Sequence, residues 1–181
     1  MQTCAEWLGQ NCEDIPKYGE KKLNSCGLPP HPSVYRPLKK VRRLILHHSA
    51  TETGCARVFR ALHRAVNGWV DIGYHFVIGN GSLSGDGQVE PGRPEWAVGA
   101  HARKNNEDSL GICLVGDLDA HPPTNAQKDA LARLLRELIS RFALSSEDII
   151  LHRDAPGCRT RCPGKNFNMD LVRELLSVSS G

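Results

Sequence analysis

The sequence predicts a mixed α/β fold, in which a central β-sheet is flanked by α-helices. Short apolar runs typical of buried strands recur along the 181 residues, and they alternate with segments whose apolar residues have helical spacing. No stretch approaches the roughly 20 apolar residues that a membrane-spanning helix needs. The contents of 40% hydrophobic and 24% charged residues are ordinary for a globular domain.

Four apolar runs and one turn define the expected sheet. The first strand is predicted at residues 41–47 and the second at residues 74–78. Asp86-Gly87 is a typical two-residue turn, and it predicts a hairpin in the segment GDGQVEPGR. Residues 110–115 form a nearly continuous apolar run, which is typical of a central strand covered on both faces. Residues 149–151 are expected to form a short buried strand.

Three helices are expected between and after these strands. Residues 55–66 place their apolar side chains on one helical face, at positions 55, 58, 59, 62 and 66. Thr124 and Gln127 form a capping box at the start of a long helix that is predicted to reach residue 144. A last helix is expected at residues 168–176.

The chain is predicted to have two parts, an N-terminal extension at residues 1–40 and a folded domain at residues 41–181. The extension is rich in Cys and Pro, and its segment GLPPHPSVYRP is typical of extended chain. Its basic residues give residues 1–43 a net charge of +4, from eight Lys and Arg against four acids. This basic segment is interpreted either as a solvated arm or as a region attracted to an anionic cell envelope.

The charge and the N-terminus also limit the partners of the protein. A net charge of only +3 does not favour a nucleic-acid partner. The first 22 residues contain early acids and no apolar core, so we expect no signal peptide.

Two histidines and one cysteine are the strongest candidates for chemistry. His47 and His152 each follow an apolar strand, and strand ends are where α/β sheets build their sites. Neighbouring side chains of a strand point to opposite faces, so only one of His47 and His48 can serve such a site. Cys162 follows His152 by ten residues, and two imidazoles with one thiolate can hold Zn²⁺ with a fourth position open for water.

The cysteine count leaves alternatives open. Seven cysteines are an odd number, so at least one thiol is expected to have another role, such as metal binding. The spacing of Cys158 and Cys162 is also compatible with a disulfide, in which case the two histidines would be structural. A closed structural zinc site with Cys158 as fourth ligand is the third possibility.

Five segments carry a resemblance to a known family. They are, in order, ILHHSAT, GWVDIGYHFVI, VEPGRPEWAVGAHA, NNEDSLGICLVG and HRDAPGCRTRCPG. Together they closely resemble the zinc-dependent N-acetylmuramoyl-L-alanine amidases of the phage-lysozyme and peptidoglycan-recognition-protein family. The resemblance covers roughly residues 41–176.

The resemblance implies a set of site residues. His47, His152 and Cys162 match the three zinc ligands, with one Zn²⁺ per chain, and the fold would hold this zinc cleft at its strand ends. Tyr74 matches a tyrosine implicated in catalysis. Thr160 stands where many relatives carry a lysine that stabilises the transition state, and a hydroxyl supplies a hydrogen bond but no charge.

The resemblance also implies the substrate and its contacts. His101 matches a position that contacts substrate near the zinc, and Asn106 and Trp69 are further candidates for the peptidoglycan groove. The implied reaction is hydrolysis of the amide between N-acetylmuramic acid and the L-alanine of the stem peptide, by an enzyme that acts on the cell wall as a monomer. The alternative is a peptidoglycan-binding protein without hydrolase activity.

The cysteines of the extension suggest a covalent tether. Cys4, Cys12 and Cys26 lie outside the family resemblance, and Cys55 lies just beyond the first proposed ligand. We expect at least one disulfide between the extension and the domain, formed through Cys55. The alternative is that all of these thiols stay reduced.

Overall fold

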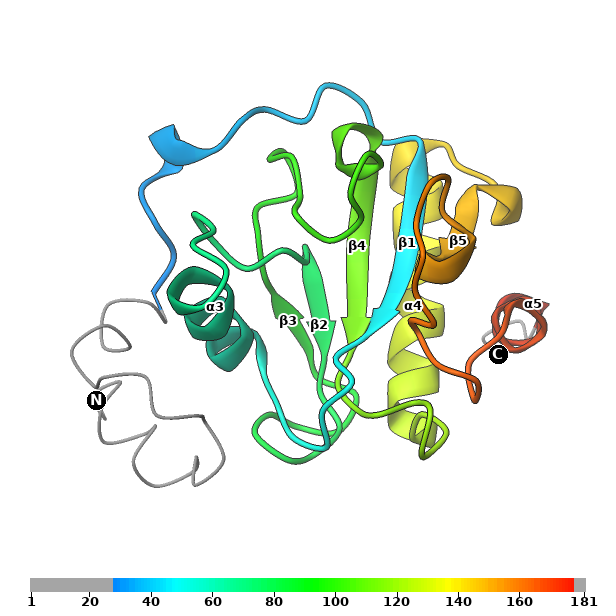
Figure 1. Ribbon diagram of the computed structural model, residues 1–181. Helices are drawn as coiled ribbons and strands as arrows, with labels where there is room; N and C mark the ends of the chain where they lie inside the picture. The colour runs from blue at the N-terminus through cyan, green and yellow to red at the C-terminus, as the bar shows by residue number, and fades with distance from the viewer. Residues whose placement is uncertain (1–27, 178–181) are drawn as a thin grey trace.

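The protein, for which we use a computed structural model, has the predicted mixed α/β fold within residues 28–177, the part that the structure describes. Its five-stranded sheet has the order β3-β2-β4-β1-β5 (Figure 1). The strands are β1 (Arg43–His48), β2 (Phe76–Ile78), β3 (Val89–Pro91), β4 (Ser109–Leu114) and β5 (Ile149–Leu151). Four of them pair in parallel, and β3 pairs antiparallel with β2. β2 and β3 pair antiparallel, but residues 79–88 join them, so Asp86-Gly87 is one turn within this connection and not a two-residue hairpin turn in the segment GDGQVEPGR.

The helices begin and end within two residues of their predicted limits. They are α3 (Ala56–Ala65), α4 (Asn125–Phe142) and α5 (Met169–Ser177). The capping box of α4 is formed: Thr124 Oγ1 accepts the N–H of Gln127, and the Gln127 side chain accepts the N–H of Thr124. Four short 3-10 helices complete the described elements, at Pro32–Val34, Asn106–Asp108, Ser146–Asp148 and His152–Asp154.

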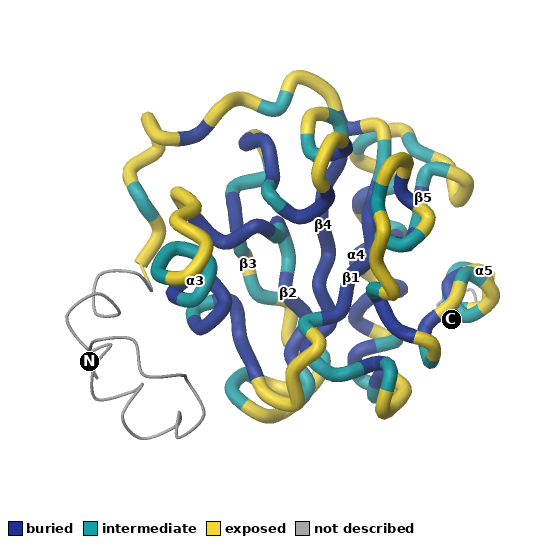
Figure 2. The backbone as a smooth tube through the Cα atoms, in the orientation of Figure 1, coloured by how far each residue is buried: buried dark blue, intermediate teal, exposed yellow. Residues whose placement is uncertain are grey.

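The hydrophobic core has two main parts, on opposite faces of the sheet. Alternate residues of β1 and β4 pack with α4 and α5 into the larger cluster. The smaller cluster joins α3 to the other face of β2 and β4. Figure 2 shows the central strands buried along their length, with the exposed chain confined to the periphery. The sheet is thus packed on both of its faces.

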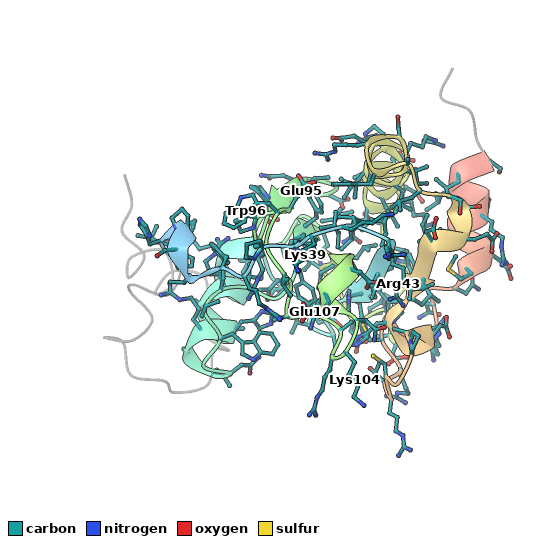
Figure 3. The ribbon with its side chains drawn as sticks, turned by 90° about the horizontal axis from the view of Figure 1, so that it is seen from above. Lys39, Arg43, Glu95, Trp96, Lys104 and Glu107 are labelled. Atoms are coloured by element: carbon teal, nitrogen blue, oxygen red, sulfur yellow. The ribbon has the colours of Figure 1, made fainter. Side chains whose placement is uncertain are left out.

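The segment just before β1 is packed onto the domain. The hydroxyl of Tyr35 donates to Oδ2 of the fully buried Asp71 at 2.6 Å, and Arg60 Nε donates to the other carboxylate oxygen at 2.6 Å. The Tyr35 ring also contacts the ring of Trp96 edge-on, with centroids 5.5 Å apart. Figure 3 views this part of the molecule from above and labels Trp96 and the neighbouring Glu95. Residues of the described chain therefore pack onto the domain from at least Tyr35 onward, which precedes the expected domain boundary. The boundary at residue 40 stays a prediction.

The expected tether through Cys55 stays a prediction. This residue caps the N-terminus of α3, is 3% exposed and has a free thiol inside the smaller cluster. A disulfide from the extension would have to open this packing. The partner cysteines Cys4, Cys12 and Cys26 lie outside the described residues. Within residues 28–177, no helix has the length and apolar character to cross a membrane.

A buried histidine links β2 to its neighbours. His75 is 1% exposed; its Nδ1 accepts the N–H of Gly111 at 2.9 Å, and its Nε2–H donates to the Ala97 carbonyl at 2.9 Å. A neutral imidazole offers one donor and one acceptor, so this ring is fully satisfied without a charge. Burial lowers the pKa of His75 from 6.5 to about 4.

We expect His75 to make the free energy of unfolding depend on pH. Its pKa in the folded protein lies below that of the unfolded chain, so its contribution is complete above pH 6.5 and is lost as the pH falls from 6.5 towards 4. The loss amounts to about 3 kcal/mol. Urea unfolding measures the free energy of unfolding at about pH 7.5 and at about pH 4.5. Between these two pH values, it should fall less for His75→Asn than for the wild type.

Val77→Ala provides the control for this measurement. Val77 is fully buried in β2 and carries no titratable group, so its truncation should lower stability at both pH values by a similar amount. If His75→Asn lost as much stability on acidification as the wild type, the buried neutral histidine would not be the cause.

Candidate metal centre

Two parallel strands bring the two predicted histidines together. β1 pairs with β5 in a register that sets Leu46 opposite Leu151. His47 follows Leu46 within β1, and His152 directly follows Leu151 at the end of β5. Because the two strands run in the same direction, the two imidazoles meet at the same edge of the sheet. The ring centroids of His47 and His152 lie 4.4 Å apart.

The pair of adjacent histidines divides between the two faces of β1. His47 points to the same face as Ile45, which packs with Ala102 and Ala155. His48 points to the opposite face, where its Nδ1 accepts the N–H of Leu118 at 3.0 Å. His48 therefore holds a loop, and His47 faces the site.

A loop after β5 brings the third predicted ligand to these histidines. The Arg153 N–H donates to the carbonyl of Cys162 at 2.8 Å, and Thr160 Oγ1 accepts the N–H of Cys162 at 3.1 Å. These bonds place Cys162 Sγ 3.7 Å from His47 Nδ1. One ligand atom from each of His47, His152 and Cys162 lies within 4.8 Å of the other two.

The donor set and its spacing fit a zinc ion. A separation of 3.7 Å between Cys162 Sγ and His47 Nδ1 is one that a single ion can span, because zinc bonds are about 2.3 Å to sulfur and about 2.0–2.1 Å to nitrogen. Burial raises the pKa of the Cys162 thiol to about 11, so the chain alone does not stabilise the thiolate. A cation beside the sulfur would do so. The arrangement is a possible His-His-Cys metal site.

Cys158 is not part of this group. Its Sγ lies 3.7 Å from Asn105 Nδ2 and 3.9 Å from the Arg103 carbonyl, and its thiol is free. Among residues 28–177, the cluster contains three ligand residues, which leaves room for a further ligand from solution. This geometry does not favour a closed site with Cys158 as fourth ligand or a Cys158–Cys162 disulfide.

His101 lies directly behind His47. The two rings are joined by a hydrogen bond of 3.0 Å between His47 Nε2 and His101 Nδ1. His101 is 8% exposed and His47 is 1% exposed. Burial holds the pKa of both imidazoles well below 6.5. The proximity of His101 and His152 adds to the effect on His47, and that of His75 and His152 adds to the effect on His101.

Tyr74 lies beside the ligands, just before β2. Its ring centroid is 5.2 Å from that of His47, and its side chain is half-buried. Burial raises the pKa of the Tyr74 hydroxyl well above 10, and the neighbouring thiols of Cys113 and Cys162 add to the effect. The hydroxyl therefore keeps its proton at neutral pH and can act as a hydrogen-bond donor.

Two hollows open on either side of these residues and share part of their lining. The hollow of about 370 Å³ contains the three ligand residues and Tyr74. The hollow of about 570 Å³ extends away from the ligands to Trp69, Arg103 and Arg159. Three residues line both hollows, namely His101, His152 and Thr160. The two hollows therefore adjoin at these residues, and the two together are called the groove.

The larger hollow also contains the other predicted substrate contacts. Trp69 is 38% exposed on its wall. Asn106 lines it too, but its Oδ1 accepts the N–H groups of His101 and Ala102, each at 2.9 Å, and so holds the loop. Lys104, next to Arg103, instead projects away from the body of the protein (Figure 3).

Two residues near the site were not singled out from the sequence. His63 of α3 contacts the rings of Trp69 and Tyr74, with centroids 4.9 Å and 5.5 Å away, and its Nδ1 accepts the N–H of Gly73. The sequence signal that could have identified His63 was its position next to the apolar stripe of this helix. Asp119 lines the smaller hollow and pairs with Arg161 at 3.6 Å, and no sequence pattern marks it.

Comparison with known proteins identifies the family. Residues 37–165 match the sequence family described as N-acetylmuramoyl-L-alanine amidase. The chain belongs to this amidase family. An endolysin of Enterobacteria phage T3 is 37% identical over 116 residues, which are 60% of this chain and 73% of the endolysin. Peptidoglycan-recognition protein SC2 of Drosophila simulans is 36% identical over 131 residues, 68% of each chain.

Solved structures of amidases share the fold. The N-acetylmuramoyl-L-alanine amidase LysC from Clostridium intestinale superposes with a TM-score of 0.69 at 29% identity, over 80% of this chain and 95% of LysC. The Ph2119 endolysin of a Thermus scotoductus bacteriophage gives a TM-score of 0.69 at 28% identity, over 81% of this chain and 92% of the endolysin. The family resemblance and the α/β fold predicted from the sequence are thereby confirmed.

Proposed function

We propose that this chain is a peptidoglycan hydrolase that cleaves the amide bond between N-acetylmuramic acid and the L-alanine of the stem peptide. The observation that carries this proposal is the convergence of His47, His152 and Cys162 beside Tyr74, in a chain of the amidase family. The endolysins and amidases among its relatives support a lytic enzyme that acts on the cell wall. Hydrolysis would leave a lactyl carboxylate on the sugar and a free α-amino group on the alanine.

The metal proposed for the site is one Zn²⁺ per chain. His47, His152 and Cys162 would hold it, and the open side of this three-ligand set faces the groove. Zinc bound in such a set supplies Lewis-acid chemistry, since it polarises a carbonyl and makes water more acidic.

Tyr74 and Thr160 are proposed to act on the reacting groups. The Tyr74 hydroxyl keeps its proton, so it can donate a hydrogen bond to the carbonyl oxygen of the scissile amide as negative charge develops there. Thr160 Oγ1 already accepts the N–H of Cys162, and its own O–H remains available to donate into the groove. Neither residue brings a positive charge.

The larger hollow is proposed to bind the substrate away from the scissile bond. Arg103 and Arg159 are exposed there, and none of the acidic residues within 28–177 lines this hollow. This charge suits the carboxylates that stem peptides carry. The exposed face of Trp69 suits the apolar face of a sugar or a peptide side chain, and His101 and Asn106 complete the proposed contacts.

Digestion of purified sacculi tests the proposed reaction. We expect the products to contain new N-terminal L-alanine and muramic acid with a free lactyl carboxylate, identified by mass spectrometry and amino-group labelling. Treatment with a chelator should stop the reaction, and added Zn²⁺ should restore it. New reducing sugar ends would instead indicate a glycosidase, and binding to sacculi without any product would indicate the alternative, a binding protein.

A further inference from the structure

A buried chain of hydrogen bonds runs from the candidate metal site into the sheet. Ser109 Oγ lies 2.5 Å from the carbonyl oxygen of Asn105 and 3.5 Å from His101 Nε2. His101 Nδ1 lies 3.0 Å from His47 Nε2, and His47 Nδ1 faces Cys162 Sγ at 3.7 Å. Ser109 is fully buried, and Asn105 is 2% exposed.

The positions of the protons in this series of hydrogen bonds follow from its buried end, the contact between Ser109 and Asn105. A carbonyl oxygen has no proton, so an approach of 2.5 Å requires that Ser109 donate its only O–H to Asn105. The lone pairs of Ser109 Oγ are then what His101 Nε2 faces. This contact, at 3.5 Å, favours the proton of a neutral His101 ring on Nε2 and the lone pair on Nδ1.

The same reasoning passes from His101 to His47. Because His101 Nδ1 is an acceptor, His47 Nε2 must donate its N–H to it across the 3.0 Å contact. A neutral His47 then has its lone pair on Nδ1, the atom that faces Cys162 Sγ. This is the tautomer that can bind a metal through Nδ1.

We propose that His101 and Ser109 are positioning residues that fix His47 in its Nδ1-binding tautomer and so prepare the site for metal. The inference rests on the metal site proposed above. Hydrogen bonds to the second nitrogen of a ligand histidine commonly set its tautomer and ring orientation. Here the partner is a second histidine, whose own tautomer is set by a serine.

The surroundings of His101 hold its ring in one orientation. A Cβ at Gly111 would lie 2.4 Å from His101 Cγ, and a Cβ at Gly99 would lie 2.5 Å from Cδ2. Side chains at these two positions would thus collide with the ring, which lies in a slot that the glycines leave free. The His101 N–H donates to Asn106 Oδ1, which fixes the backbone of the same residue.

Nitrogen-15 NMR of the metal-free protein tests the tautomers directly. We expect the protonated nitrogen to be Nε2 in both His47 and His101. In Ser109→Ala, His101 loses its acceptor, so its tautomers should mix while the protein stays folded. A wild-type spectrum with the His47 proton on Nδ1 would overturn the inference.

Zinc affinity, measured by competition with a chromogenic chelator, tests the consequence. We expect His101→Leu to weaken zinc binding by about 10–100-fold, because no acceptor remains for the His47 N–H. His101→Asn should recover most of the affinity, since Asn Oδ1 occupies the place of Nδ1 and accepts the same proton. Ile45→Val is the control, because it trims a buried neighbour on the same face of β1 without touching a hydrogen bond.

The outcomes separate this inference from the proposed site. If the wild type has no measurable zinc affinity, the metal site is wrong and the inference falls with it. If the wild type binds zinc and His101→Leu binds it equally well, the site stands and the positioning role is wrong. Equal losses in His101→Leu, His101→Asn and Ile45→Val would likewise assign the effect to packing alone.

Discussion

Replacing Cys162 with serine should abolish both the lytic activity and most of the zinc binding. Cys162 is one of the three proposed ligands, and its thiolate is the one that would supply negative charge to the ion. A serine hydroxyl stays protonated near neutral pH and is a poor substitute. Elemental mass spectrometry measures the zinc content, and the clearing of a sacculi suspension measures the lytic activity. Both are measured on the same preparation.

Cys158→Ser is the matched control for the metal. Cys158 lies four residues earlier in the same loop, carries a free thiol and contacts the Arg103 carbonyl rather than the cluster. Its serine variant should therefore bind zinc like the wild type, and circular dichroism should show both variants folded. Full zinc content and wild-type lysis in Cys162→Ser would refute the assignment of the ligands.

Much of the fold could be predicted because local patterns determine it. The capping box of Thr124 and Gln127 and the turn at Asp86-Gly87 each use side-chain or backbone chemistry within four residues. The buried strand β4 was visible as an uninterrupted apolar run, and all six of its residues are buried. Such signals do not depend on which element lies next to which.

The site was predictable only in part, because it depends on the register between strands. That His47 and His152 follow strands was visible, but their contact depends on the parallel pairing of Leu46 with Leu151. The place of Cys162 came from the family resemblance, since a loop of ten residues can reach many positions. The bond between His47 and His101 joins residues 54 positions apart and has no local signal.

Two features of the structure could not be predicted from the sequence. Cys55 lies at the start of α3 with its thiol packed in the core, while its expected disulfide to the extension stays a prediction. Tyr35 was placed in the extension because the chain around it is rich in proline. Its hydroxyl instead satisfies the buried Asp71, a long-range contact that composition does not reveal.

The Tyr74→Phe variant should keep its zinc and its fold but lose activity by about 10²–10⁴ in rate. The change removes only the hydroxyl, and the ring still packs beside His47. The lost donor is the one proposed to stabilise charge on the amide oxygen, so turnover should fall while the binding of sacculi persists. Turnover is measured by release of N-terminal L-alanine at saturating sacculi, corrected for the zinc-loaded fraction.

Tyr35→Phe makes the same chemical change at a site outside the groove. Tyr35 donates to the buried Asp71, so loss of its hydroxyl leaves a carboxylate oxygen without this partner and should lower stability by about 1–3 kcal/mol. Its turnover per folded molecule should equal that of the wild type. We expect Tyr74→Phe to lose turnover at unchanged stability, and Tyr35→Phe to lose stability at unchanged turnover. This pair of results would assign the Tyr74 hydroxyl to the reaction. Unchanged turnover in Tyr74→Phe would reduce this residue to packing against the ligands.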